Sequence, residues 1–304
     1  MRRLAPFAAL PLAVLLSGCF QIFSTLTVRP DGSAVVVERV TAEGAMAMGL
    51  MAVGQAGGSN SFEARASSLG EGVTLASVEQ TYAPGSVTYV VTYDVADVNQ
   101  LAYDLSDAVS PDEMGESIMG GVLTGDDEET GAEWEEDWDD DEVVSDEIEV
   151  EGDEEGEGEI EAGDEASAPY RFAFEPASGA GPATLQITVP EGAAGPGDLD
   201  ASQMGGGGDS EEDTFNRLLV LFGTMTMRFD VAVNGTLVEA DRGWADGARV
   251  TLSDVQMAPL LEYARDEIAD GDVQAFLDAR TQSEDVDIPG LRAVAPGTVT
   301  VRFR

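Results

Sequence analysis

The clearest pattern along the chain is a strict alternation of apolar and polar residues. Valine or tyrosine occupies every second position in Val87–Val95, which is typical of a half-buried β-strand. Two earlier apolar runs, Leu26–Val28 and Val35–Val37, flank the sequence Pro30-Asp31-Gly32. Proline presets φ in such a turn and glycine takes a positive φ, so these segments predict a β-hairpin.

Similar patterns continue to the C-terminus. Strands are predicted at Val73–Gln80, Tyr170–Phe174, Leu185–Val189, Phe229–Val233, Thr236–Ala240, Arg249–Val255 and Val299–Phe303. Asn234-Gly235, between two of these strands, is the strongest short hairpin signal in the chain.

Apolar residues at helical spacing predict several short helices among the strands. They are expected at Ala45–Val53, Ser61–Leu69, from Ser110 onward, Ser210–Phe222, Met257–Ile268 and Val273–Leu277. Hairpins with interspersed amphipathic helices predict an α+β fold with a mainly antiparallel sheet. The pattern leaves open whether there is one sheet or two.

The N-terminus has the layout of an export signal. Arg2 and Arg3 precede an apolar run, Leu4–Leu16, and small residues follow before Cys19. The run is too short to span a bilayer, which takes about 20 residues. Residues 1–18 are therefore predicted to be a cleaved signal peptide.

The residues at this cut site, Leu16-Ser17-Gly18-Cys19, resemble the lipobox of bacterial lipoproteins. The resemblance implies that Cys19 receives a thioether-linked diacylglycerol and fatty acid such as palmitate, and becomes the first mature residue. In a Gram-negative cell, Phe20 rather than aspartate after the cysteine would fit sorting to the outer membrane. The alternatives are an ordinary secretory signal and a buried cysteine beside an apolar segment.

Composition excludes several classes of chemistry. The 304 residues include neither histidine nor lysine, and Cys19 is the only cysteine. Histidine-based triads, lysine Schiff bases, zinc sites built on cysteine and intramolecular disulfides are therefore ruled out. The net charge of −44 would repel the phosphates of nucleic acid, so no nucleic-acid partner is expected.

Much of this charge lies in one segment. Acidic residues fill 24 of the 40 positions from 126 to 165. Like charges at this density predict a disordered insertion over 124–167. The insertion separates an N-terminal module, 19–123, from a C-terminal module, 168–304, and the two modules are expected to pack against each other. We expect a loose cation cloud there and no specific metal site, because Asp137–Asp141 lacks the glycine of calcium-binding loops.

Two of the three tryptophans, Trp134 and Trp138, lie within the acidic segment. At a spacing of four residues they would share one helix face, which predicts a contact with an envelope protein partner. The alternative is that both pack on the protein's own sheet.

The remaining mature chain is also acidic, with 35 acidic residues against 13 arginines. High external salt would screen this surface, which favours a halophilic source. Arginine in place of every lysine fits either that adaptation or GC-rich codon usage.

The hairpin around Pro30-Asp31-Gly32 and the strand Val87–Val95, behind a lipobox, resemble LppM-like lipoproteins over about a third of the chain. Taken together, these features predict a lipid-anchored, extracytoplasmic lipoprotein with a non-catalytic structural or partner-binding role and no cofactor. The alternative is a carboxylate-dependent hydrolase, such as a glycosidase, acting on an envelope substrate.

Overall fold

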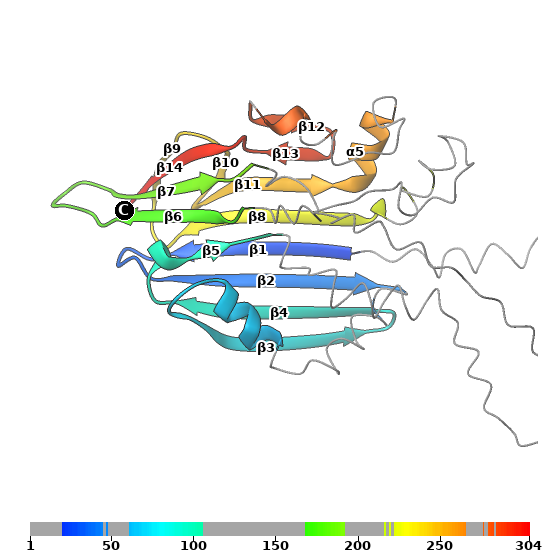
Figure 1. Cartoon of the computed structure of the whole chain (residues 1–304), viewed down its shortest axis with the longest axis horizontal. Helices are drawn as coiled ribbons and strands as arrows, with labels where there is room; N and C mark the ends of the chain where they lie inside the picture. The colour runs from blue at the N-terminus through cyan, green and yellow to red at the C-terminus, as the bar shows by residue number, and fades with distance from the viewer. Residues whose placement is uncertain are drawn as a thin grey trace, which may run out of the picture.

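A computed structural model of the whole chain shows two β-sheets packed against each other (Figure 1). It describes residues 20–44, 61–105, 168–191, 222–265 and 284–304, together with positions 47, 216, 219, 276 and 279–282. The larger sheet has nine strands and is called sheet A here, and the smaller one, sheet B, has five.

Sheet A follows the order β12-β13-β11-β8-β1-β2-β4-β3, with β10 paired to β11. Its strands are β1 (Phe20–Val28), β2 (Ala34–Glu43), β3 (Val73–Ala83), β4 (Ser86–Val95), β8 (Met225–Val233), β10 (Trp244–Asp246), β11 (Arg249–Gln256), β12 (Val286–Ile288) and β13 (Leu291–Ala293). Sheet B follows the order β5-β6-β7-β14-β9. Its strands are β5 (Ala102–Tyr103), β6 (Tyr170–Glu175), β7 (Ala183–Val189), β9 (Leu237–Ala240) and β14 (Gly297–Phe303).

The predicted β1–β2 hairpin is confirmed. Its strands pair in register from Phe20 opposite Ala42 to Val28 opposite Ala34. Gly32 has φ +86°, and a Cβ there would lie 2.9 Å from the ring of Phe174 in sheet B. Glycine therefore gives the turn both its backbone conformation and its close approach to the second sheet.

The expected α+β class is corrected to a β-rich fold. In the described part of the chain, helical residues occur at 61–68, at η1 (Val98–Gln100), at α5 (Met257–Ala264), at 279–281 and at the single positions 47, 216, 219, 222 and 276. Strands make up most of the described residues, and the core forms where one sheet packs on the other. The mainly antiparallel pairing is confirmed, with β1 and β8 as the parallel pair.

Strands from both sides of the acidic segment share each sheet. In sheet A, β1 pairs with β8 over all nine residues, from Phe20 opposite Met225 to Val28 opposite Val233. In sheet B, β5 pairs with β6. The parts of the chain before and after the acidic segment therefore fold together.

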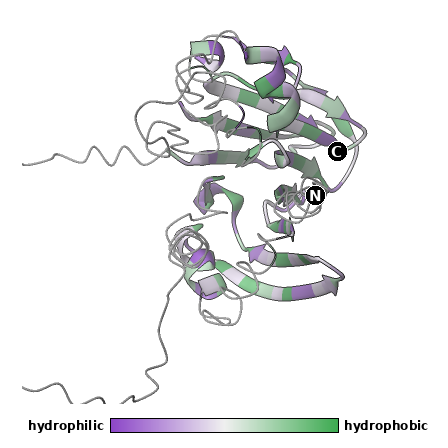
Figure 2. Ribbon diagram, turned by 90° about the vertical axis from the view of Figure 1, so that its right-hand side faces the viewer, coloured by the Kyte–Doolittle hydropathy of each residue, from purple (hydrophilic) through white to green (hydrophobic). Residues whose placement is uncertain are grey.

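The core follows the alternation of the strands, which Figure 2 shows as changing hydropathy along each ribbon. Every second residue of β1 and β4 is buried, from Phe20 to Val28 and from Val87 to Val95. Between the sheets, the Tyr103 ring stacks on Phe229 with centroids 4.8 Å apart, and Tyr170 meets Phe229 edge-on at 4.9 Å.

The prediction of a hairpin at Asn234-Gly235 is wrong. β8 before it lies in sheet A and β9 after it lies in sheet B, so the chain crosses between sheets here. Neither residue has a positive φ, as a type I′ turn would require. A Cβ on Gly235 would lie 2.2 Å from the carbonyl oxygen of Arg304, so close backbone packing requires this glycine.

Several expectations concern other parts of the chain. The segments 45–53, 110–113, 124–167 and 192–208 lie outside the described residues, apart from position 47. The predicted helices at 61–69 and from Met257 are confirmed where they are described.

Candidate functional site

The residues predicted to carry the lipid anchor lie just before the first described strand. Leu16, Ser17, Gly18 and Cys19 are outside the described residues, and β1 begins at Phe20. Trp134 and Trp138, the predicted partner contact, are likewise outside the described part. Cys19 is therefore joined directly to a strand that is hydrogen-bonded on both sides, to β2 and to β8.

A buried ion pair that the sequence pattern did not indicate lies under the helical turns at 61–68. Arg65 Nη2 donates to Glu38 Oε1 at 3.0 Å and to the carbonyl oxygen of Asp104 at 2.8 Å. The two side chains are 11% and 6% exposed. The Tyr103 hydroxyl donates to Ser24 Oγ at 2.6 Å and lies 3.0 Å from Glu38 Oε1.

This cluster joins three layers of the fold. Ser24 and Glu38 are direct partners on β1 and β2. Tyr103 belongs to sheet B, and the Arg65 guanidinium lies 5.5 Å from its ring centroid. Because breaking a buried pair leaves a charge without a partner, the cluster holds the helical segment and both sheets in one arrangement.

Burial raises the pKa of the Tyr103 hydroxyl well above its usual value, and the Glu38 charge raises it further. Burial raises the pKa of Tyr93 and of Tyr170 as well. These hydroxyls therefore stay protonated at neutral pH, and the Tyr103 hydroxyl serves as a hydrogen-bond donor within the cluster.

The sequence carried one sign of this cluster. Glu38 stands at an inward position of β2, between Val36 and Val40, where alternation otherwise places apolar residues. A carboxylate at such a position needs a buried partner. Nothing in the sequence pattern indicated that the partner would be Arg65, 27 residues later.

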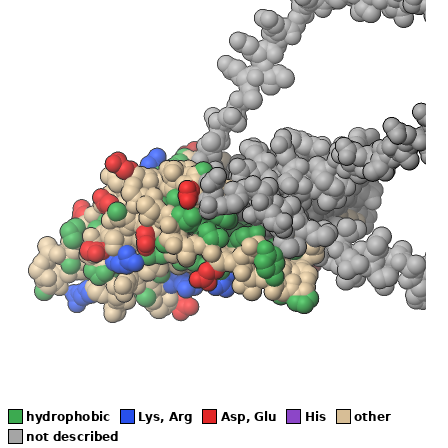
Figure 3. Space-filling view, turned by 90° about the horizontal axis from the view of Figure 1, so that it is seen from below, with side chains coloured by type: hydrophobic (Ala, Val, Ile, Leu, Met, Phe, Trp, Pro, Cys, Tyr) green, Lys and Arg blue, Asp and Glu red, His purple; other side chains and the backbone are tan. Residues whose placement is uncertain are grey.

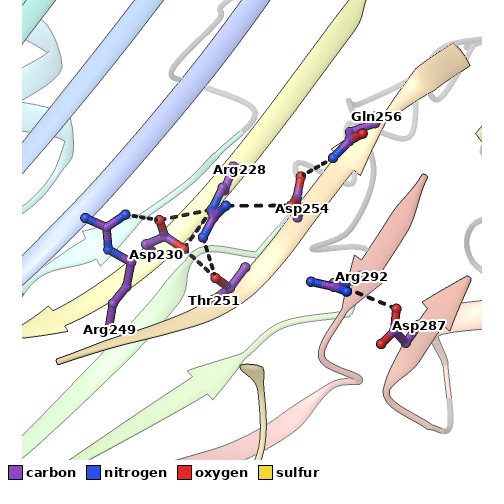
Figure 4. A network of polar contacts seen from close by, with 8 residues as sticks. All are labelled: Arg228, Asp230, Arg249, Thr251, Asp254, Gln256, Asp287 and Arg292. Carbon is purple, nitrogen blue, oxygen red and sulfur yellow. Dashed lines mark hydrogen bonds and ion pairs between the residues drawn. The ribbon is translucent and has the colours of Figure 1, made fainter. Parts of the chain in front are cut away.

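A second network covers the opposite face of sheet A (Figure 4). Phe229 points toward sheet B, so its neighbours Arg228 and Asp230 point away from it. The Asp230 carboxylate accepts from Arg228 Nε at 3.0 Å and from Thr251 Oγ1 at 2.7 Å, and Arg249 Nη1 lies 3.3 Å away. Its side chain is only 5% exposed.

The network continues to the edge of the sheet. Arg228 Nη1 lies 3.9 Å from Asp254 Oδ2. On β12 and β13, Asp287 accepts from Arg292 Nε at 3.1 Å and from the indole nitrogen of Trp244 at 3.2 Å. Alternating charges across four strands balance one another, so this face is a stabilising ladder of paired groups.

A shallow pocket on sheet B holds the two carboxylates most relevant to the hydrolase alternative. Glu239, Asp241, Thr300 and Arg302 line it. Glu239 Oε2 lies 3.2 Å from Arg302 Nη1, and Asp241 Oδ1 accepts from the Thr300 amide at 2.7 Å. Both carboxylates already have partners at an exposed site, whereas a glycosidase acid requires an environment that keeps it protonated.

None of the helices in the described part of the chain is long and apolar enough to cross a membrane. No group of three metal-ligating side chains that could hold an ion occurs among the described residues.

Comparisons with known proteins add little to this description. No family model matches the chain, and no curated protein matches it. Among solved structures, the NMR structure of the folded domain of Mycobacterium tuberculosis LppM aligns with 94% of this chain and 90% of that domain. The identity is 7% and the TM-score is 0.26.

Proposed function

We propose that this chain is an envelope lipoprotein, anchored through acylated Cys19, with a non-catalytic structural or partner-binding role. The lipobox-like residues Leu16-Ser17-Gly18-Cys19 support the anchor. The mature protein then stands outside the cytoplasmic membrane, with its two-sheet body next to the lipid.

The observation that carries the proposal is the start of β1 at Phe20, one residue after Cys19. Cleavage before Cys19 removes residues 1–18 and leaves every described strand in place. The new N-terminus is the residue next to a central strand of sheet A, so the anchor is joined directly to a strand that pairs with a neighbour on each side.

The paired state of the charged groups supports a non-catalytic role. Glu38, Asp230 and Glu239 each have an arginine partner. Groups held in this way stabilise a body and do not offer a free acid and base to a substrate.

The anchor is tested by expressing the full chain and its Cys19→Ser variant in a bacterial host with lipoprotein processing. We expect the parent protein in the membrane fraction, with a mass increase for diacylglycerol on Cys19. The variant should move to the soluble fraction. A variant that stays with the membrane, or a parent without lipid on Cys19, would overturn the anchor.

A further inference from the structure

We propose that the end of sheet A at which β1 begins rests on the bilayer surface, with Tyr82 at the level of the lipid headgroups. This inference rests on the acylation of Cys19 proposed above. The new element is the surface of the folded body that faces the membrane.

The length of the tether supports this orientation. Cys19 and Phe20 share a peptide bond, so their Cα atoms are about 3.8 Å apart. No linker separates the acylated residue from the strand. The opposite end of β1, at Val28, lies eight residues further on, about 26 Å away at 3.3 Å per residue.

Strand register places Tyr82 at the same end of the sheet as Phe20. Phe20 pairs with Ala42, Ala42 with Val87, and Val87 with Tyr82, so these four residues form one row across β1, β2, β4 and β3. Three strand spacings of about 4.8 Å separate Tyr82 from Phe20, roughly 14 Å along the row.

The chemistry of Tyr82 suits a membrane interface. Its side chain is 57% exposed, the most exposed of the large apolar side chains in the described part of the chain. Tyrosine has an apolar ring and a polar hydroxyl, a combination that favours the headgroup region. Seen from the β3 side, apolar side chains lie toward this end of the described surface, and most charged ones lie further from it (Figure 3).

A second exposed aromatic residue lies on an element at the same end. Figure 1 places α5 at the same end of sheet A as the start of β8, across the sheet from the β3–β4 hairpin. Tyr263 on this helix is 47% exposed. The net charge of −44 disfavours anionic headgroups, so the surface that fits is one of neutral, zwitterionic lipid.

Val238 provides a matched control position. It lies on β9, is 51% exposed and belongs to the opposite end of the molecule. The amide of Asn234, four residues before it, donates to the carbonyl oxygen of Val28. Both positions are exposed strand residues, so a label at either one should leave the fold intact.

The experiment uses the acylated full chain, in which Cys19 is blocked by lipid. A cysteine introduced by Tyr82→Cys or Val238→Cys is then the only free thiol and can carry a nitroxide label. In vesicles of phosphatidylcholine and phosphatidylethanolamine, electron paramagnetic resonance measures collisions with oxygen, which enters lipid, and with a water-soluble nickel chelate. Circular dichroism confirms that both variants fold.

We expect the ratio of oxygen to nickel collisions to be at least threefold higher at position 82 than at position 238. Equal ratios, with diacylglycerol detected on Cys19 by mass spectrometry, would overturn the orientation and leave the lipoprotein proposal standing. Absence of lipid on Cys19 would overturn both.

Discussion

At the scale of single residues, the fold depends on how charged groups are matched inside it. Glu38 and Arg65 lie in a core that is otherwise apolar, and each satisfies the other. Asp230 does the same on the outer face with Arg228 and Thr251. In such surroundings a single carboxylate is tolerated only where its partners are already in position.

Removing both members of the buried pair should therefore cost less than the sum of the two single removals. We expect Glu38→Gln to lower the free energy of unfolding by about 3 kcal/mol, because Arg65 loses its counter-charge in a buried site. Arg65→Met should have a similar effect. The double variant should be less destabilised than the sum of the two, as urea unfolding of the mature Cys19→Ser chain would show.

The exposed pair between Glu239 and Arg302 is the control for this prediction. Arg302→Met should change stability by less than about 1 kcal/mol, because water already solvates both partners. Additive losses at Glu38 and Arg65, or losses as small as the control, would show that the buried pair does not stabilise the fold.

At the scale of elements, the helical turns at 61–68 must come very close to the segment that leads into β5. Gly70 has φ +134°, and a Cβ there would lie 2.1 Å from the carbonyl oxygen of Gln100. The amide of Ala102 donates to the carbonyl oxygen of Leu69 at 2.8 Å. This contact also holds Tyr103, the next residue, in place beside Glu38 and Arg65.

We expect Gly70→Ala to destabilise the protein by about 3 kcal/mol or more, since neither the backbone angle nor the space admits a methyl group. Gly85→Ala provides a comparison, because Gly85 also has a positive φ, +80°, but no atom lies within 4 Å of its Cβ position. That variant should lose only about 1 kcal/mol. Equal losses in thermal unfolding would show that the contact with Gln100 can relax.

Elements were predictable from sequence where local pattern decides the structure. The β4 strand and the β1–β2 hairpin follow from alternation and turn residues alone. The first half of β1 was missed because Phe23 and Ser24 break the alternation. β5 is only two residues long and depends on pairing with β6, across the acidic segment. Asn234-Gly235 has the local pattern of a hairpin, yet tertiary contacts with Val28 and Arg304 determine its course.

The functional features also divide into those visible in the local sequence and those that depend on tertiary structure. The proposed anchor rests on a local pattern, Leu16-Ser17-Gly18-Cys19, which can be read from the sequence alone. The Glu38–Arg65 cluster and the row from Phe20 to Tyr82 depend on strand register, which joins residues far apart in sequence. Register requires knowledge of which strands are neighbours, and the parallel pairing of β1 with β8 has no local signature.

At the scale of the whole molecule, the excess of negative charge should oppose folding at low salt. The mature chain outside 126–165 keeps 35 acidic residues against 13 arginines, so repulsion among surface carboxylates opposes the compact state. At 0.1 M salt the Debye length is about 10 Å, and at 1 M it is about 3 Å. Neighbouring carboxylates should therefore be largely screened only at the higher concentration.

We expect the thermal midpoint of the mature Cys19→Ser chain to rise by about 10 °C between 0.1 M and 1 M sodium chloride, about 3 kcal/mol at this size. Deleting residues 124–167 should preserve most of the rise, because the excess charge of the folded body remains. Sucrose, which stabilises without screening charge, should raise the thermal midpoints of the full-length and the deleted chain equally. A midpoint that does not respond to salt would exclude adaptation to high salt, and a response lost on deletion would assign the repulsion to the acidic segment alone.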